Sequence, residues 1–315
     1  MFNLIDGVSV FFVLSGFLVG KILIKEFLTK EISLFTLLNF WKRRWLRTLP
    51  SYFLVLTLVL TLSIVTHNQI DLSIIEYLFF VQNFTSEHPT FFPEAWSLSV
   101  EEWFYLLFPA LVFLQFLLFK RNKEGLFLAS ILCFLVLPFV LRTLQWNENQ
   151  EVDLRKIVIY RLDAIVYGVL VAYLFFRFNL NLLKYKIHLL CVGLILVFVL
   201  LFNPFNWKAI FPPVNYPLES LSFGLFIPFL VDLKKTTWNF ANQFIQFMST
   251  RSYGLYLVNL SLVQGIIPIH SKLKSYFFMD SPLVPYLLFW IFSLLIADFI
   301  YRFFEKPILN WRDKR

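Results

Sequence analysis

The 315-residue chain is 59% hydrophobic and 20% aromatic, and only 15% of its residues are charged. One soluble core would not require so much apolar surface, so the composition excludes an ordinary soluble domain and predicts an all-α, polytopic transmembrane helix bundle. The formal net charge of +8 does not indicate nucleic-acid binding, because Lys and Arg fall in short connections between apolar runs and form no basic domain.

About nine apolar runs are long enough to cross a hydrocarbon layer of roughly 30 Å as helices. The run 74–81 is too short to cross and is interpreted as an interfacial or re-entrant helix on the outer side. Basic residues gather on one side of the spans, which the positive-inside rule assigns to the cytoplasm. The predicted location is therefore the cell (plasma or inner) membrane, with multiple passes. The predicted spans are 8–24, 49–65, 96–119, 126–144, 157–176, 187–202, 217–233, 252–268 and 285–304.

The first span is followed by positive charge at Lys21 and Lys25, which places Met1 outside the cytoplasm. A signal peptide has the opposite order of charge and a small-residue cleavage site, and neither is found here. An outward N-terminus fits a chain whose preceding helix is absent, so that nine spans remain of ten. The sequence therefore predicts one integral-membrane domain over 1–315, truncated at its N-terminus.

Two arginines precede the second span. Arg44 and Arg47 are three residues apart and share one face of a helix. Their guanidinium groups can hold phosphates in bidentate fashion, which favours a site for a nucleotide-bearing donor. Ordinary positive-inside anchoring, with Trp41 and Trp45 at the interface, explains the same pattern equally well.

Two adjacent acids, Glu101 and Glu102, begin the apolar run that starts at Trp96. Ionisable groups in membrane spans usually face an internal cavity and have a function. Glu101 and Tyr105 are four residues apart and share a helical face, whereas Glu102 points elsewhere. A snorkelling or water-exposed acid near a helix end is the structural alternative.

A later span begins with Arg161 and Asp163 on the same outer side. An intramembrane ion pair of this segment with Glu101 is one plausible arrangement, and it is also the structural alternative to catalysis. The sequence contains no HExxH, CxxC, GxSxG, GxGxxG or P-loop pattern, so we expect no metal site and no bound cofactor.

Six segments along the chain resemble motifs of the membrane acyltransferase-3 family, which includes the O-acetyltransferases of O-antigen, exopolysaccharide and peptidoglycan. The likeness covers nearly the whole chain. The segments are GVSVFFVLSGFL at 7–18, RWLRTLP at 44–50, WSLSVEEWFY at 96–105, RLDAIVYG at 161–168, SYGLYL at 252–257 and FEKP at 304–307.

The resemblance implies an O-acyltransferase that moves an acyl group, usually acetyl, from cytoplasmic acetyl-CoA to a hydroxyl of an extracytoplasmic glycan. Its implied partners are the lipid bilayer, acyl-CoA as donor substrate, and a glycan or lipid-linked saccharide as acceptor, with no nucleic acid. It implies that Arg44 and Arg47 hold CoA phosphates and that Glu101 and Tyr105 help line the path or the acceptor site, where we expect these two residues to be catalytic. The residues implied to line the acyl path or the acceptor side are Ser15, Trp96, Ser97, Arg161 and Asp163.

Two departures from the family pattern bear on activity. The family's first helix, with the histidine usually assigned as catalytic base, has no counterpart before Met1. Asn259 stands where many relatives have a histidine, and an asparagine cannot take a proton at neutral pH. Two further interpretations therefore stay open: a transporter or flippase for a lipid-linked saccharide, and an inactive truncated acyltransferase.

Overall fold

Every regular element in the described part of the chain is a helix, which confirms the predicted all-α class. Because a bilayer offers no water to unpaired backbone groups, a spanning segment of this composition must satisfy its hydrogen bonds within a helix. The computed structural model describes residues 7–29, 33–67, 74–119, 122–146, 154–177, 181–202, 212–234, 236–264 and 283–314.

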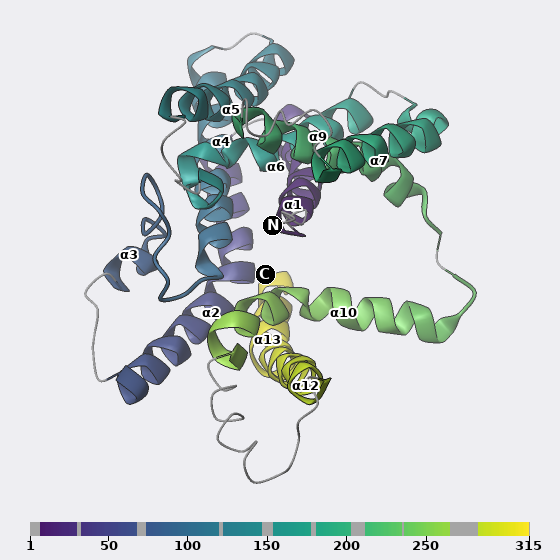
Figure 1. Cartoon of the computed structure of the whole chain (residues 1–315). Coiled ribbons are helices and arrows are strands. Elements are labelled where there is room, and N and C mark those ends of the chain that lie inside the picture. The colour runs from purple at the N-terminus through teal and green to yellow at the C-terminus, as the bar shows by residue number, and fades with distance from the viewer. Residues whose placement is uncertain are drawn as a thin grey trace. The chain divides into compact units, whose positions relative to one another are not determined.

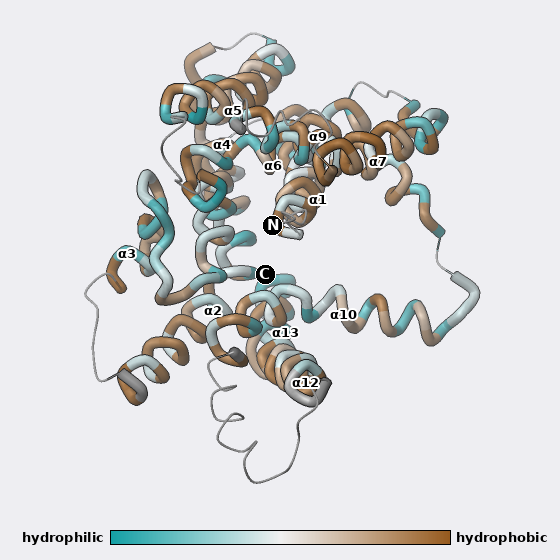
Figure 2. The backbone as a smooth tube through the Cα atoms, viewed as in Figure 1, coloured by the Kyte–Doolittle hydropathy of each residue, from teal (hydrophilic) through white to brown (hydrophobic). Residues whose placement is uncertain are grey.

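Six helical segments of the described residues are long and apolar enough to cross a membrane, and each overlaps a predicted span, although the helix of the span 49–65 begins earlier, at Leu34. The protein is therefore a multi-pass membrane protein. Figure 2 shows hydrophobic residues along most of α7 (Lys186–Phe202), one of the helices involved. The six segments are Gly7–Leu28, Leu34–Val65, Ala95–Leu118, Lys123–Gln145, Leu182–Phe202 and Tyr286–Asp313.

The other three predicted spans also fall on helices, namely α6 (Leu162–Phe176), α9 (Asn215–Asp232) and α10 (Asn239–Val258). α6 has 15 residues. At about 1.5 Å per residue it is about 22 Å long, less than the hydrocarbon layer. A total of nine spans thus stays a prediction, and the end of the run 252–268 lies outside the described residues. The short run 74–81 forms the helix α3 (Ile74–Leu78).

Residues 1–39, 83–87 and 96–234 form one compact unit, called here the first unit. Its helices are α1 (Gly7–Leu23), α4 (Ala95–Leu118), α5 (Lys123–Gln145), α6, α7 and α9. α1 packs along α6, α7 packs on α9, and α5 also contacts α6 (Figure 1). α6 is thus the central helix of this unit, with α1, α5 and α9 against it.

Two glycines permit the close crossing of α1 and α6. A Cβ on Gly16 would lie 1.9 Å from the carbonyl oxygen of Ile165, and one on Gly168 would lie 2.0 Å from that of Val13. Both obstacles are backbone atoms, so neither can move aside as a side chain would. The small residues therefore set the distance between the helices, as is common in membrane helix pairs.

Residues 40–82, 88–95 and 235–315 form the second unit. It contains most of α2 (Leu34–His67), α3, α10, α12 (Leu283–Ile300) and α13 (Lys306–Asp313). Tyr52 of α2 is fully buried in the core of this unit. The Tyr52 ring stacks on Phe92 with centroids 5.7 Å apart, and the Tyr52 hydroxyl donates to the carbonyl of Tyr77 at 2.9 Å.

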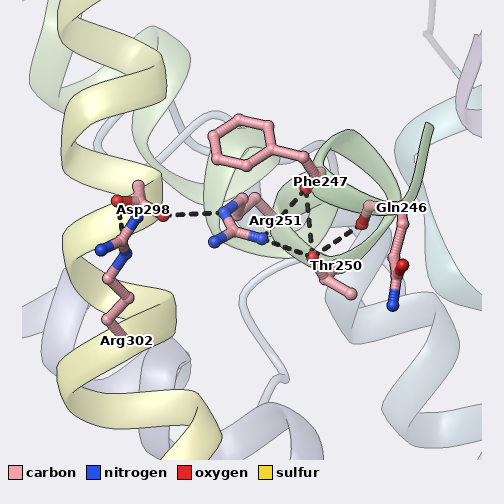
Figure 3. A network of polar contacts seen from close by, with 6 residues as sticks. All are labelled: Gln246, Phe247, Thr250, Arg251, Asp298 and Arg302. Carbon is pink, nitrogen blue, oxygen red and sulfur yellow. Dashed lines mark hydrogen bonds and ion pairs between the residues drawn. The ribbon is translucent and has the colours of Figure 1, made fainter. Parts of the chain in front are cut away.

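An ion-pair network fastens α10 to α12 within the second unit (Figure 3). Arg251 donates from Nε to Oδ1 of Asp298 at 2.8 Å, and Arg302 donates to Oδ2 of the same carboxylate at 2.8 Å. The Arg251 guanidinium also lies over the ring of Phe247, 4.0 Å from its centroid. Figure 3 shows the carboxylate of Asp298 between the two arginines. This one acid therefore pairs with Arg251 of α10 and with Arg302, which is four residues further along the chain.

Candidate functional site

Glu101, Tyr105 and Ser15 form a chain of polar contacts in the first unit. The Tyr105 hydroxyl donates to Oε1 of Glu101 at 3.0 Å, which confirms that these two residues share a face of α4. The hydroxyl oxygens of Tyr105 and Ser15 lie 2.5 Å apart, which links α4 to α1. Glu101 and Tyr105 are both buried, at 2% and 3% exposure. The carboxyl group thus orients a hydroxyl that a second hydroxyl also contacts.

Trp96 and Ser97, at the beginning of α4, are both buried. The Trp96 ring meets Phe12 of α1 edge to face, with centroids 5.9 Å apart. The Trp96 carbonyl accepts a hydrogen bond from Nδ2 of Asn83 at 3.1 Å. These contacts hold the head of α4 against α1 and the 83–87 segment, so they position the Glu101 side chain one turn further along.

Asp163 is paired with an arginine that the sequence interpretation does not name. Arg142 of α5 donates from Nη1 and Nη2 to the two carboxylate oxygens of Asp163, at 3.0 and 2.6 Å. Its Nη1 also donates to the carbonyl of Tyr160. Arg142 is fully buried and Asp163 is 1% exposed. The bidentate geometry is the strong form of this pair and joins α5 to the first turn of α6.

Arg161 directly precedes α6 and is fully buried. Its Nη2 donates to Oγ of Ser9 at 2.6 Å, and its guanidinium lies over the rings of Tyr216 and Phe12, at 5.1 and 5.9 Å. Arg161 therefore contacts α1 and α9 and does not form the ion pair with Glu101 that was one plausible arrangement. The Nη2 end of its guanidinium is turned toward Ser9 on the adjoining α1.

Arg142 is the residue of this cluster that sequence reasoning missed. It lies inside the predicted span 126–144, in the apolar context Phe139-Val140-Leu141-Arg142. A charge within a membrane span is itself the signal that would have found it, because such residues are rare and usually have partners. Its partner could not be read from the sequence, since the two residues belong to different helices.

Arg44 and Arg47 lie on α2 in the second unit. They are helical, as their predicted shared face requires, with Arg44 half-buried and Arg47 exposed. The Arg44 guanidinium lies 5.9 Å from the centroid of the Phe40 ring. Arg47 is close enough to the carboxylate of Glu305 for the two charges to attract each other. The pair thus presents one accessible guanidinium and one that is partly packed.

Three of the motif segments meet in the second unit around Thr48 and Glu305. The Tyr253 hydroxyl donates to the carbonyl of Thr48 at 2.8 Å. A Cβ on the next residue, Gly254, would lie 3.5 Å from Oε1 of Glu305. The segments 44–50, 252–257 and 304–307 are therefore neighbours. The segments 7–18, 96–105 and 161–168 meet in the first unit, through the contacts of Ser15, Phe12 and Ser9 described above.

Glu94 anchors a widened turn of helix in the second unit. Its Oε1 accepts from the backbone N–H groups of Leu260 and Ser261, at 2.8 and 2.7 Å, and its Oε2 accepts from the Ser261 hydroxyl. Both donors belong to the π-helical turn Asn259–Gln264. Burial raises the pKa of the Glu94 carboxyl, and the hydrogen bonds from Ser261 and Leu260 oppose that rise.

Asn259, the residue at the histidine position of many relatives, begins this π-helical turn. Its side-chain oxygen Oδ1 is buried and has no hydrogen-bond partner in the described part of the chain. Such turns frequently mark functional sites, because they displace side chains from regular helical positions. The amide can orient a hydroxyl by hydrogen bonding, but it cannot act as a base.

The sequence of this chain is similar to those of known acyltransferases. A family model described as an acyltransferase domain matches residues 7–302. A protein named "Putative O-acetyltransferase" from Staphylococcus aureus (strain COL) is 30% identical, over 97% of this chain and 54% of its own length. The O-acetyltransferase OatA of Staphylococcus aureus (strain NCTC 8325 / PS 47) is 27% identical, over 96% and 52%. The chain thus spans about half the length of these curated relatives. No solved structure matches it.

Proposed function

The chain belongs to the acyltransferase-domain family, and on that premise we propose that it is a membrane O-acyltransferase. It moves an acyl group, with acetyl as the expected one, from cytoplasmic acyl-CoA to a hydroxyl of a glycan or lipid-linked saccharide outside the plasma membrane. The observation that carries the proposal is the match over residues 7–302, which includes every motif segment described above except 304–307.

Arg44 and Arg47 are proposed to hold the phosphates of acyl-CoA. Arg47 is exposed, and the two guanidinium groups are one turn apart on α2. Guanidinium groups bind phosphate oxygens with paired hydrogen bonds. Glu305 lies close enough to Arg47 for a carboxylate there to attract the guanidinium.

Glu101 and Tyr105 are proposed to act on the acceptor hydroxyl. The carboxyl group fixes the Tyr105 hydroxyl at 3.0 Å, and Ser15 fixes it from the opposite helix at 2.5 Å. A hydroxyl held at two points can orient an incoming hydroxyl and assist the transfer of its proton. Trp96, Ser97, Arg161 and Asp163 would shape the surrounding path, with Asp163 acting as the partner of Arg142.

The decisive experiment places the full chain in lipid vesicles with [14C]acetyl-CoA and a partially hydrolysed bacterial cell-wall glycan. The Arg44→Ala, Arg47→Ala double variant should lose transfer of label to glycan while it still inserts into the membrane. Arg43→Ala is the matched control, because Arg43 is on the same helix and its side chain forms an exposed ion pair with Asp313 at 3.7 Å. Full transfer by the double variant would contradict the CoA assignment.

The same assay tests the alternative of a saccharide transporter. Buried charges such as Arg142 and Asp163 also occur along transport paths in membrane proteins. Movement of labelled glycan across the vesicle membrane, without covalent transfer of acetyl label, would favour the transporter. Transfer of label to the glycan supports the enzyme.

A further inference from the structure

The guanidinium of Arg161 carries a buried positive charge with unused hydrogen-bond donors. Its Nη2 donates to Ser9, whereas Nε and Nη1 have no hydrogen-bond partner among the residues that the structure describes. The side chain is 0% exposed, so water in bulk does not reach these donors. Buried polar groups are nearly always paired, and an exception is commonly explained by a function or by a bound group.

Among the described residues, Arg161 forms no hydrogen bond to a carboxylate. The neighbouring Arg142 engages both carboxylate oxygens of Asp163, at 3.0 and 2.6 Å. Both guanidinium groups lie over the ring of Tyr216, 5.1 and 5.4 Å from its centroid. The three ionisable side chains thus hold two positive charges and one negative charge. The aromatic ring attracts the cations through its face, but it leaves the in-plane N–H donors of Arg161 unused.

Arg161 also lies close to the head of α4. Its guanidinium is 5.9 Å from the ring of Phe12, and the same ring meets Trp96 edge to face at 5.9 Å. Arg161 and the 96–105 segment therefore contact the same residue of α1. The guanidinium of Arg161 thus shares a neighbour with the first turn of the helix that carries Glu101 and Tyr105.

Resting on the proposed function, we propose that Arg161 donates its unused N–H groups to the oxygen that becomes negative during acyl transfer. The acceptor hydroxyl oxygen bonds to the thioester carbonyl carbon, and the π electron pair of the carbonyl moves onto its oxygen. When that pair returns, the C–S bond breaks, and the CoA sulfur receives the proton that the hydroxyl lost. A fixed cationic donor in a water-poor site stabilises the oxygen without having to reorganise.

Kinetics of the full chain in vesicles tests this role, with [14C]acetyl-CoA and the partially hydrolysed cell-wall glycan as probes. Arg161→Gln should lower kcat by about 10²-fold or more and leave the KM for acetyl-CoA unchanged, because one donor to an oxyanion contributes on that scale. Arg161→Lys keeps the charge and should lose less. An unchanged kcat in Arg161→Gln would overturn this role alone, whereas a wild-type chain that transfers no label would overturn the proposed function and this role together.

Thermal unfolding in detergent separates a functional charge from a structural one. Arg161→Met removes a charge that has no hydrogen-bonded carboxylate among the described residues, and it should leave the unfolding midpoint equal or higher. Arg142→Met is the matched comparison: it leaves Asp163 buried without its bidentate partner and should lower the midpoint. If Arg161→Met lowers the midpoint as much as Arg142→Met does, Arg161 is a structural residue and the proposal falls.

Discussion

The hydroxyl oxygens of Tyr105 and Ser15 lie 2.5 Å apart and join α4 to α1 by a contact between two small polar groups. Tyr105 also donates to Glu101, so its hydroxyl connects a buried carboxyl group to the opposite helix. The contact brings together two segments that are 90 residues apart in the chain. The Tyr105 hydroxyl is thus the central atom of the candidate acceptor site.

Tyr105→Phe removes the hydroxyl group of Tyr105 and keeps the aromatic ring. We expect acyl transfer to fall by about tenfold, since a hydrogen bond worth roughly 1.4 kcal/mol in the transition state corresponds to that factor. Transfer of [14C]acetyl to glycan in vesicles measures it. Tyr185→Phe, at a 53% exposed position, is the control and should transfer at the wild-type rate. Wild-type activity in Tyr105→Phe would exclude a role for the hydroxyl.

Gly16→Ala should destabilise the first unit. The added Cβ would lie 1.9 Å from the Ile165 carbonyl oxygen, so α1 and α6 would have to move apart. Overpacking of this kind costs about 1–3 kcal/mol, and backbone obstacles favour the upper part of that range. Gly7→Ala is the control, because nothing lies within 4 Å of its added Cβ. The unfolding midpoints in detergent should therefore separate clearly, and equal midpoints would contradict the close crossing.

The Arg142–Asp163 pair should show strong coupling in a double-mutant cycle. Arg142→Met or Asp163→Leu alone leaves one buried charge unpaired and should cost about 3–5 kcal/mol, while the double variant should cost less than the sum. Chemical denaturation in detergent provides the free energies. Arg177 and Glu124 form an exposed ion pair, at 44% and 45% exposure, that serves as the control. Glu124→Gln should change the free energy of unfolding by about 1 kcal/mol or less. Additive effects at Arg142 and Asp163 would argue against the buried pair.

Glu94 should make stability depend on pH in a defined direction. Because burial raises its pKa above the ordinary value of 4.5, the folded protein binds more protons than the unfolded chain between the two pKa values. The contribution of Glu94 is therefore fully present at lower pH and is lost as the pH rises through the folded pKa. Glu94→Gln should remove this dependence.

Unfolding midpoints of wild type and Glu94→Gln, measured from pH 4 to pH 8, test the direction. The wild type should lose stability relative to the variant as the pH rises. Glu87→Gln, an exposed residue of the preceding loop, should give a profile parallel to that of the wild type. A constant difference between wild type and Glu94→Gln across this range would show that the Glu94 carboxyl does not titrate differently in the folded state.

Local patterns accounted for those parts of the site that lie within one helix. The four-residue spacing of Glu101 and Tyr105 predicted a shared face, and their hydrogen bond confirms it. The three-residue spacing of Arg44 and Arg47 likewise placed both on consecutive turns of α2. These relations follow from the helical repeat alone, so they do not depend on which helices are neighbours.

The sequence pattern did not predict which residues on different helices pair with each other. Asp163 pairs with Arg142, 21 residues away on α5, while its near neighbour Arg161 turns to Ser9, 152 residues away on α1. Glu94 likewise anchors the turn that contains Ser261, 167 residues further along. A charged residue in an apolar run signals that a partner exists, but it carries no information on which helix supplies it.

The sequence by itself determined the all-α class, the position of the main spans and the family. Hydropathy suffices for the first two, because a backbone in lipid must satisfy its own hydrogen bonds along the segment. Only the tertiary structure decided which partner each buried charged side chain contacts. The close approach of α1 and α6 at Gly16 and Gly168 brings Ser9 to Arg161 and leaves Asp163 to Arg142. That choice depends on the packing of helices distant in sequence, which no local pattern encodes.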